Sequence, residues 1–238
     1  MKKTFRNLIL IAIVVVAALI ILAVVWGQPK KKTVDDSTNI LSVKDAQAQS
    51  YAVDKQPVLR KDDRISGSKN APLQIFVYED YASPLSAALA ETLQKIQAES
   101  GDKVAVIVRS YVLKGSALSR QSALAVDCAD EEGKWLEMRT ALFALAKQRL
   151  IAGDFVNYAK QIGLNEEKFS ACLTNEEKSG KIEQLAKENE DYKIQGSPTI
   201  FVGDEMIPGA RPYEDFIDSN GDKIEGLKSL IARKLNSQ

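Results

Sequence analysis

Four side chains near the end of an apolar run, Glu79, Asp80, Ser83 and Ser86, are candidates for chemistry. A serine acts as a nucleophile only when an adjacent base activates it. The chain contains no histidine, which excludes a Ser-His-Asp triad, a Cys-His dyad and a histidine-bearing zinc site. Serine followed by Pro84 also makes a good helix start, because serine caps free amides and proline suits the first helical position. We therefore interpret Ser83 as a helix cap rather than as a nucleophile.

Acidic residues occur in two places where a site is conceivable. Glu79 and Asp80 could perform general acid–base work, but no nucleophile or metal partner is evident, so we interpret them as loop or capping carboxylates. Asp218 to Asp222 hints at a cation loop. Its glycine is misplaced for an EF-hand, and no glutamate stands at the twelfth position. We expect a polar turn there and no metal site.

The composition narrows the class of protein. Hydrophobic residues are 45% and charged residues 27% of the 238 positions, which is normal for a globular protein. Cys128 and Cys172 are the only cysteines, so a four-cysteine zinc or iron–sulfur site and a CxxC pair are excluded, and we expect no cofactor. Before Val34 there are six basic and no acidic residues, which leaves 26 basic against 32 acidic residues in the remainder. A mildly acidic body argues against a nucleic-acid partner.

Residues 8–26 form an uninterrupted apolar run that ends in Trp26. A helix over this run would be about 28 Å long, close to the hydrocarbon thickness of a bilayer, and tryptophan favours its interface. The alternative is a cleaved signal peptide, which has a shorter apolar region and a small-residue cleavage site. Val25-Trp26-Gly27 is a poor cleavage site, so we favour an uncleaved, single-pass transmembrane anchor.

The positive-inside rule leaves the orientation of this anchor almost undecided, because three basic residues lie on each side of it. We expect residues 1–7 in the cytoplasm and the body on the extracytoplasmic side of the cell membrane. An even cysteine count in an exported domain fits that orientation. Residues 27–64 are polar and weakly patterned, and we interpret them as a linker to a body that comprises residues 65–238.

The body is predicted to be α/β, in the order β-α-β, helical block, β-β-α. The first three elements imply a parallel strand pair joined by a crossover helix. The helical block covers about 116–192, with breaks expected near four glycines. Strands are predicted at 73–78, 104–108, 199–202 and 205–207, helices at 84–99, 212–216 and 224–235, and breaks near Gly133, Gly153, Gly163 and Gly180.

This order resembles the thioredoxin fold with an all-helical insertion, as in the DsbA-like thiol–disulfide oxidoreductases. Six segments that follow one another in the family's order carry the resemblance. They are 67–72, the entry to the first strand; 78–81, the approach to the active site; 109–113, after the second strand; 133–138 with 142–143, an insertion helix; 196–202, the cis-proline loop and its strand; and 207–213, which opens the last helix.

The sequence departs from the family pattern at the catalytic motif. The family has Cys-x-x-Cys where this chain has Ser83-Pro84-Leu85-Ser86. Disulfide exchange needs a thiolate, and oxygen forms no persistent analogue of the disulfide that the cycle requires. Ser83 and Ser86 therefore cannot perform the family reaction, and no catalytic residue is assigned.

The resemblance also implies roles for residues outside this motif. Ser197 and Pro198 match the cis-proline pair, whose loop offers backbone groups to an extended peptide without any need for sulfur. The expected binding residues are therefore Ser83, Pro84, Leu85, Ser197 and Pro198. Cys128 and Cys172 resemble a second cysteine pair in the insertion of some members. We predict a structural disulfide, with two separate buried thiols or a redox-active pair as the alternatives.

Two functions follow from this sequence. The first is a redox-inactive, membrane-anchored module that binds an extracytoplasmic peptide or protein partner, in the manner of a chaperone of the cell envelope. The second is an oxidoreductase that uses Cys128 and Cys172 or the thiols of a partner. A third possibility is a structural subunit of an envelope complex. We favour the first, and hence a protein that is not an enzyme.

Overall fold

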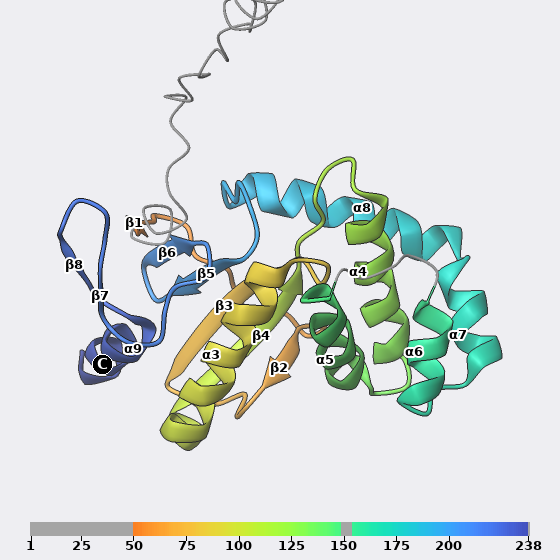
Figure 1. Ribbon diagram of the computed structural model, residues 1–238, viewed down its shortest axis with the longest axis horizontal. Coiled ribbons are helices and arrows are strands. Elements are labelled where there is room, and N and C mark those ends of the chain that lie inside the picture. The colour runs from red at the N-terminus through yellow and green to blue at the C-terminus, as the bar shows by residue number, and fades with distance from the viewer. Residues whose placement is uncertain (1–49, 149–153, 238) are drawn as a thin grey trace, which may run out of the picture. The chain divides into compact units, whose positions relative to one another are not determined.

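A six-stranded sheet forms the centre of the structure, a computed structural model that describes residues 50–148 and 154–237 (Figure 1). The strand order is β1-β6-β5-β3-β4-β2. β3 and β4 pair in parallel, and the other neighbours pair antiparallel. The strands are β1 (Tyr51–Ala52), β2 (Arg64–Ser66), β3 (Leu73–Glu79), β4 (Val104–Ser110), β5 (Thr199–Val202) and β6 (Glu205–Pro208).

Helix α3 (Pro84–Ser100) is the crossover that the parallel pair requires. It begins where the Ser83 side chain accepts a hydrogen bond from the Ser86 backbone N–H at 3.3 Å, with proline at the first helical position. The helix ends at Gly101, whose φ of 56° lies in the left-handed region that glycine tolerates best. A short 3-10 turn, η1 (Gly101–Lys103), then leads into β4.

The sheet separates two apolar cores because successive strand residues point to opposite faces. Ile75 and Val77 of β3 pack with α3 and the insertion in the larger cluster. Phe76 and Tyr78 belong to a smaller cluster on the other face, with Phe201 of β5. The near-continuous apolar sequence of β3 and β4 follows from this covering of both faces.

The insertion between β4 and β5 is entirely helical in its described part. It contains α4 (Ala117–Asp130), α5 (Trp135–Ala146), α6 (Phe155–Gln161), α7 (Glu166–Leu173) and α8 (Glu176–Asp191). A disulfide between Cys128 and Cys172 joins α4 to α7, with a Cα–Cα distance of 5.8 Å. Both cysteines are buried, so the bond lies inside the insertion.

The predicted order of elements is confirmed, with two corrections to the helices. No helix break occurs at Gly180, because α8 begins at Glu176, after the capping side chain of Asn175, and runs through the glycine. The helix expected at 212–216 is wrong: Phe216–Ile217 (β7) pairs with Lys223–Ile224 (β8) in a hairpin, and only α9 (Leu227–Asn236) closes the chain. The acidic stretch forms the turn of that hairpin, where Asp218 Oδ1 accepts from two backbone N–H groups.

The linker boundary at residue 64 is also wrong, because the body begins earlier. Tyr51 and Ala52 pair with β6 at one edge of the sheet, and β2 lies at the opposite edge. The segment between them therefore crosses the sheet, and Val53 and Leu59 pack on the smaller apolar cluster. The polar composition of this segment indicates a linker, but its charged side chains form contacts within the folded body.

The predicted anchor at 8–26 lies outside the described residues, as does most of the linker. Among residues 50–148 and 154–237 no helix has the length and apolar character needed to cross a bilayer.

A buried ion-pair network ties the crossing segment to the body. Arg109 of β4 is 3% exposed and donates to both carboxylate oxygens of Asp63 at 2.8 Å. It also donates to Glu188 of α8 at 2.8 Å and to the hydroxyl of Tyr78 at 2.9 Å. Burial raises the pKa of Asp63, but hydrogen bonds from Arg109 and the Arg60 backbone outweigh it and leave this pKa below its ordinary value.

We expect Asp63→Asn to lower the free energy of unfolding by about 3 kcal/mol at pH 7, because the buried guanidinium of Arg109 loses its bidentate carboxylate partner and keeps only the carboxylate of Glu188. The contribution of Asp63 is present above its ordinary pKa of about 4 and is lost as pH falls through the lower folded value. The gap between wild type and variant should therefore narrow below pH 4 in urea titrations. Asp62→Asn, at a side chain that is 87% exposed, is the control, and an equal loss there would contradict the prediction.

Candidate functional site

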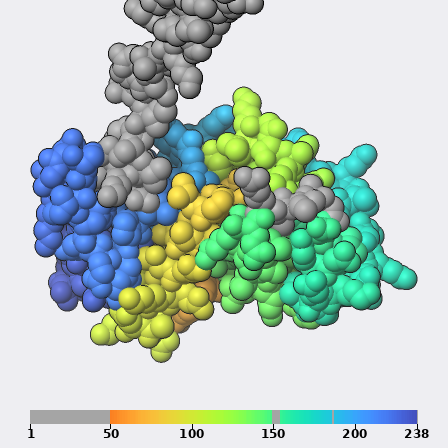
Figure 2. Space-filling view, in the orientation of Figure 1, coloured from red at the N-terminus to blue at the C-terminus, as the bar shows by residue number. Residues whose placement is uncertain are grey.

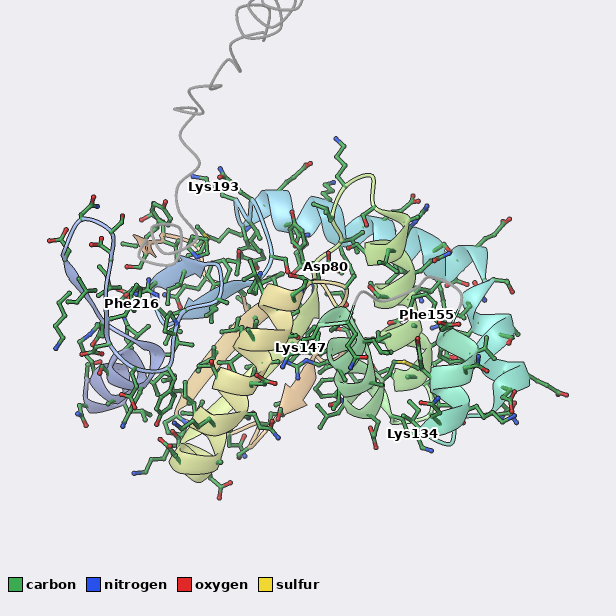
Figure 3. The ribbon with its side chains drawn as sticks, in the orientation of Figure 1. Asp80, Lys134, Lys147, Phe155, Lys193 and Phe216 are labelled. Atoms are coloured by element: carbon green, nitrogen blue, oxygen red, sulfur yellow. A yellow bond between two sulfur atoms is a disulfide. The ribbon has the colours of Figure 1, made fainter. Side chains whose placement is uncertain are left out.

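The four residues that replace the family's Cys-x-x-Cys lie at one end of the sheet, where β3 leads into α3 (Figure 3). Ser83 is half-buried and caps α3, as described above. Pro84 and Leu85 are exposed, and Leu85 keeps 42% of its surface. Ser86 is fully buried under the first turn of the helix. The two hydroxyls therefore differ: one faces the surface and the other the interior.

The buried hydroxyl of Ser86 meets the loop that precedes β5. The Ser197–Pro198 peptide bond is cis, and Ser197 Oγ lies 2.9 Å from Ser86 Oγ. The same Ser197 oxygen accepts a hydrogen bond from the Asp80 backbone N–H at 2.6 Å. A hydroxyl can serve both bonds, because it has one donor and two acceptor positions. These contacts join the two segments that form the site.

Asp80 behaves as a turn residue. Its Oδ1 accepts from the Ala82 backbone N–H at 2.9 Å, which fixes the turn that leads to Ser83. Burial raises the pKa of Asp80, and hydrogen bonds from Ala82 and the Ser119 hydroxyl only partly oppose this. This agrees with our interpretation of Asp80 as a local, structural carboxylate.

The interpretation of Glu79 as a loop or capping carboxylate is wrong. Its side chain is fully buried and accepts two hydrogen bonds from Arg139 of α5, at 2.6 and 2.7 Å. Arg139 also lies over the ring of Phe143, 4.9 Å from its centroid. A bidentate ion pair between two largely buried side chains thus joins the last residue of β3 to the helical insertion.

Sequence reasoning missed Arg139, Asp63 and Glu188 as partners of the residues near the site. One signal was present for Arg139: it stands between Met138 and the apolar pair 142–143 on a helix that must pack against the body. A charged residue on such a face needs a buried partner. No comparable pattern marks Asp63 or Glu188, since both lie in highly charged segments.

The functional groups at the start of α3 are the hydroxyls of Ser83 and Ser86 and the carboxylates of Glu79 and Asp80, with no thiol or histidine in this turn. Among the described residues no three His, Cys, Asp or Glu side chains are placed to hold a metal ion. Within the same residues no hydrogen bond uses the backbone N–H or C=O of Ser197. Those two groups are available to an extended chain.

The family follows from comparison with known proteins. The thioredoxin family model matches residues 60–218, which is more than half of the chain. Disulfide bond formation protein D of Bacillus subtilis is 24% identical over 194 residues, covering 76% of this chain and 83% of that protein. The chain belongs to the thioredoxin family. Within that family it is a DsbA-like member.

Solved structures agree on the fold. Oxidised BdbD from Bacillus subtilis superimposes with a TM-score of 0.61 at 23% identity, over 78% of this chain and 98% of that one. The thiol-disulfide exchange protein alpha-DsbA2 from Wolbachia pipientis gives 0.58 at 18% identity, over 74% and 87%. At such identities the likeness concerns the fold alone.

A different kind of relative matches only in part. The Na(+)/H(+) antiporter NhaA 1 of Mycobacterium sp. (strain KMS) is 27% identical over 157 residues. The match covers 65% of this chain but only 25% of the antiporter. The matched part of the chain spans about a quarter of the length of the antiporter.

The hydroxyl pair of the site gives a double-mutant prediction. Ser86→Ala should lower the free energy of unfolding by about 1 kcal/mol, and Ser197→Ala by about 2 kcal/mol, because the latter also leaves the Asp80 N–H without a partner. Both changes remove the same bond, so the double variant should lose about 1 kcal/mol less than the sum of the two. Chemical denaturation measures all four proteins, and strict additivity would show that the bond contributes nothing.

Proposed function

We propose that this chain is a membrane-anchored, extracytoplasmic peptide- or protein-binding module of the DsbA-like group, redox-inactive at the usual site and chaperone-like in action. The observation that carries the proposal is the 2.9 Å contact between Ser86 and Ser197, where the family motif would place a sulfur atom. The proposal concerns binding in the cell envelope and assigns no catalytic residue.

The loss of redox function follows from the chemistry of oxygen. A helix N-terminus lowers the pKa of a cysteine thiol into the range of a useful nucleophile, but a serine hydroxyl starts far too high for this effect to suffice. Ser83 uses its oxygen as a cap, and Ser86 uses its own in the contact with the cis-proline loop. Both hydroxyls thus have structural roles that need no exchange reaction.

Peptide binding is supported by what remains at the site. Ser197 is half-buried, and its backbone N–H and C=O are unpaired among the described residues. The exposed Leu85 precedes Ser86, which contacts Ser197. Main-chain hydrogen bonds supply affinity for any extended segment, and nearby apolar side chains supply preference. Such a site accepts many sequences, as a chaperone requires.

Membrane attachment is supported by the sequence and by one relative. The apolar run at 8–26 has the length of a spanning helix. The partial match to an Na(+)/H(+) antiporter gives a precedent for a unit of this kind within a membrane transport protein. We propose that the partner is met in the cell envelope, close to the membrane.

The competing hypothesis is an oxidoreductase that uses Cys128 and Cys172. These residues are joined to each other and are only 3% and 8% exposed, which favours a structural bond that external thiols reach poorly. We expect a reduction potential below about −300 mV for this pair. Equilibration with dithiothreitol, followed by alkylation and mass spectrometry, measures it, and a potential near −200 mV would favour the redox hypothesis.

Backbone recognition at the site can be tested by removing one N–H group. Ser197→Pro deletes the free N–H of the loop, whereas Ser197→Ala keeps it and loses the same hydroxyl. With a reduced, carboxymethylated, permanently unfolded client protein, we expect the proline variant to bind at least tenfold more weakly than the alanine variant. Surface-immobilised full chain in nanodiscs gives both dissociation constants.

Thermal unfolding of the two variants is the control, since the comparison requires that both remain folded. Equal affinities of the folded variants would contradict recognition through this loop. Absence of measurable client binding by the wild-type chain would refute the proposed function itself.

A further inference from the structure

Helices α3 and α5 lie side by side, and their surfaces adjoin (Figures 1 and 2). A cavity between them is distinct from the serine site. Its volume is about 490 Å³, within the range of cavities that hold small ligands. β4 contributes Val106 and Val108 to the floor, and α3 contributes Ala87 and Ala90 to one wall. The small alanine side chains leave room between the two helices.

The opposite wall combines apolar side chains with two charged ones, Arg139 and Lys147. Leu136, Arg139 and Phe143 of α5 all line the cavity. Leu136 keeps 42% of its surface and leaves an apolar side chain accessible in this wall. Covering this apolar surface with an apolar group of a ligand is favourable, because it removes the surface from water.

Arg139 provides a fixed hydrogen-bond donor in this wall. Its Nε and Nη2 atoms are both engaged by Glu79, and its side chain is 12% exposed. Within residues 50–148 and 154–237, no partner is found for its third nitrogen, Nη1. Because the carboxylate of Glu79 offsets the charge, the remaining N–H suits a neutral carbonyl oxygen rather than an anion.

We propose that this α3–α5 cavity binds an apolar side chain together with an adjacent backbone carbonyl, that is, an uncharged residue of a peptide. Leu136, Phe143 and the alanines of α3 would contact the side chain, and Arg139 would donate to the carbonyl oxygen. The ion pair of Glu91 with Lys147 bounds the cavity further along α3 (Figure 3).

The cavity and the serine site share helix α3. Ser86 belongs to the site and Ala90, four residues on, to the cavity, which is about 6 Å along the axis. An extended peptide covers that distance in about two residues. The claim that a residue of a bound client enters the cavity rests on the proposed function. The affinity of the cavity for a small probe does not.

The test uses N-acetyl-leucinamide, which presents one apolar side chain between two neutral carbonyl groups. Titrated into the full chain in phosphatidylcholine nanodiscs, it should shift the NMR signals of the Leu136 methyls and the Arg139 Nε–H saturably. We expect a dissociation constant on the order of a few millimolar. Ala90→Phe, which fills the cavity, should weaken binding at least tenfold.

Ala88→Phe adds the same ring to an exposed position of the same helix and should change the affinity less than about twofold. The second probe is the α-amide of N-acetyl-aspartate, which keeps a free side-chain carboxylate. It should bind at least tenfold more weakly than the leucine probe, because the carboxylate would be desolvated without meeting an unpaired cation. A folded Ala90→Phe variant that still binds, or an aspartate probe that binds more tightly, would overturn the proposal. So would the absence of saturable shifts in the wild-type chain.

Failure here is separable from failure of the proposed function, because the client assay uses the Ser197 loop and this one uses Ala90. Client binding that depends on Ser197 but not on Ala90 would leave the proposed function standing and exclude a peptide residue from the cavity.

Discussion

The hydrogen bond between Ser86 and Ser197 is the interaction on which the site depends. It links the first turn of α3 to the loop before β5, and the Asp80 N–H completes the contact from the end of β3. The hydroxyls of Ser86 and Ser197 therefore join the turn between β3 and α3 to a loop that is more than 100 residues away in sequence. The Ser86 hydroxyl is buried and engaged with the loop, so it forms part of the structural framework of the site.

Buried charges fix the surroundings of this framework. Arg139 holds Glu79 from the insertion, and Arg109 holds Asp63 and Glu188 from the crossing segment and α8. Each carboxylate belongs to an element that adjoins the sheet near the site, and each has a guanidinium partner on another element. Removing one partner of such a pair costs far more than an exposed pair contributes, so these contacts specify how the insertion sits on the sheet.

The regular part of the fold was predictable because the apolar strands are short, unbroken and bounded by turn residues. The strand at 199–202 matches the prediction at both ends. Asn175 shows why other boundaries failed: a cap that satisfies free amides decides a helix start, and it outweighs a glycine five residues later. The segment before β2 failed because its charges resemble those of a linker, and only the tertiary structure shows that Asp63 is buried.

The site was predictable in position but not in its bonding. Motif order placed Ser83, Ser86 and the cis-proline loop together, since the thioredoxin fold brings them to one end of the sheet. The partner of Glu79 depends on how α5 packs, and no local pattern encodes that packing. The α3–α5 cavity likewise arises from alanines that sequence reasoning treats as ordinary helix formers.

Insulin reduction by the full chain tests the central claim most directly, with the Ser83→Cys/Ser86→Cys variant as the positive control. Our account predicts no turnover above a thiol-free background for the natural chain and clear turnover for the variant, whose new thiols stand at the start of α3. Turnover by the natural chain that disappears when Cys128 and Cys172 are replaced by alanine would contradict a redox-inactive binding module.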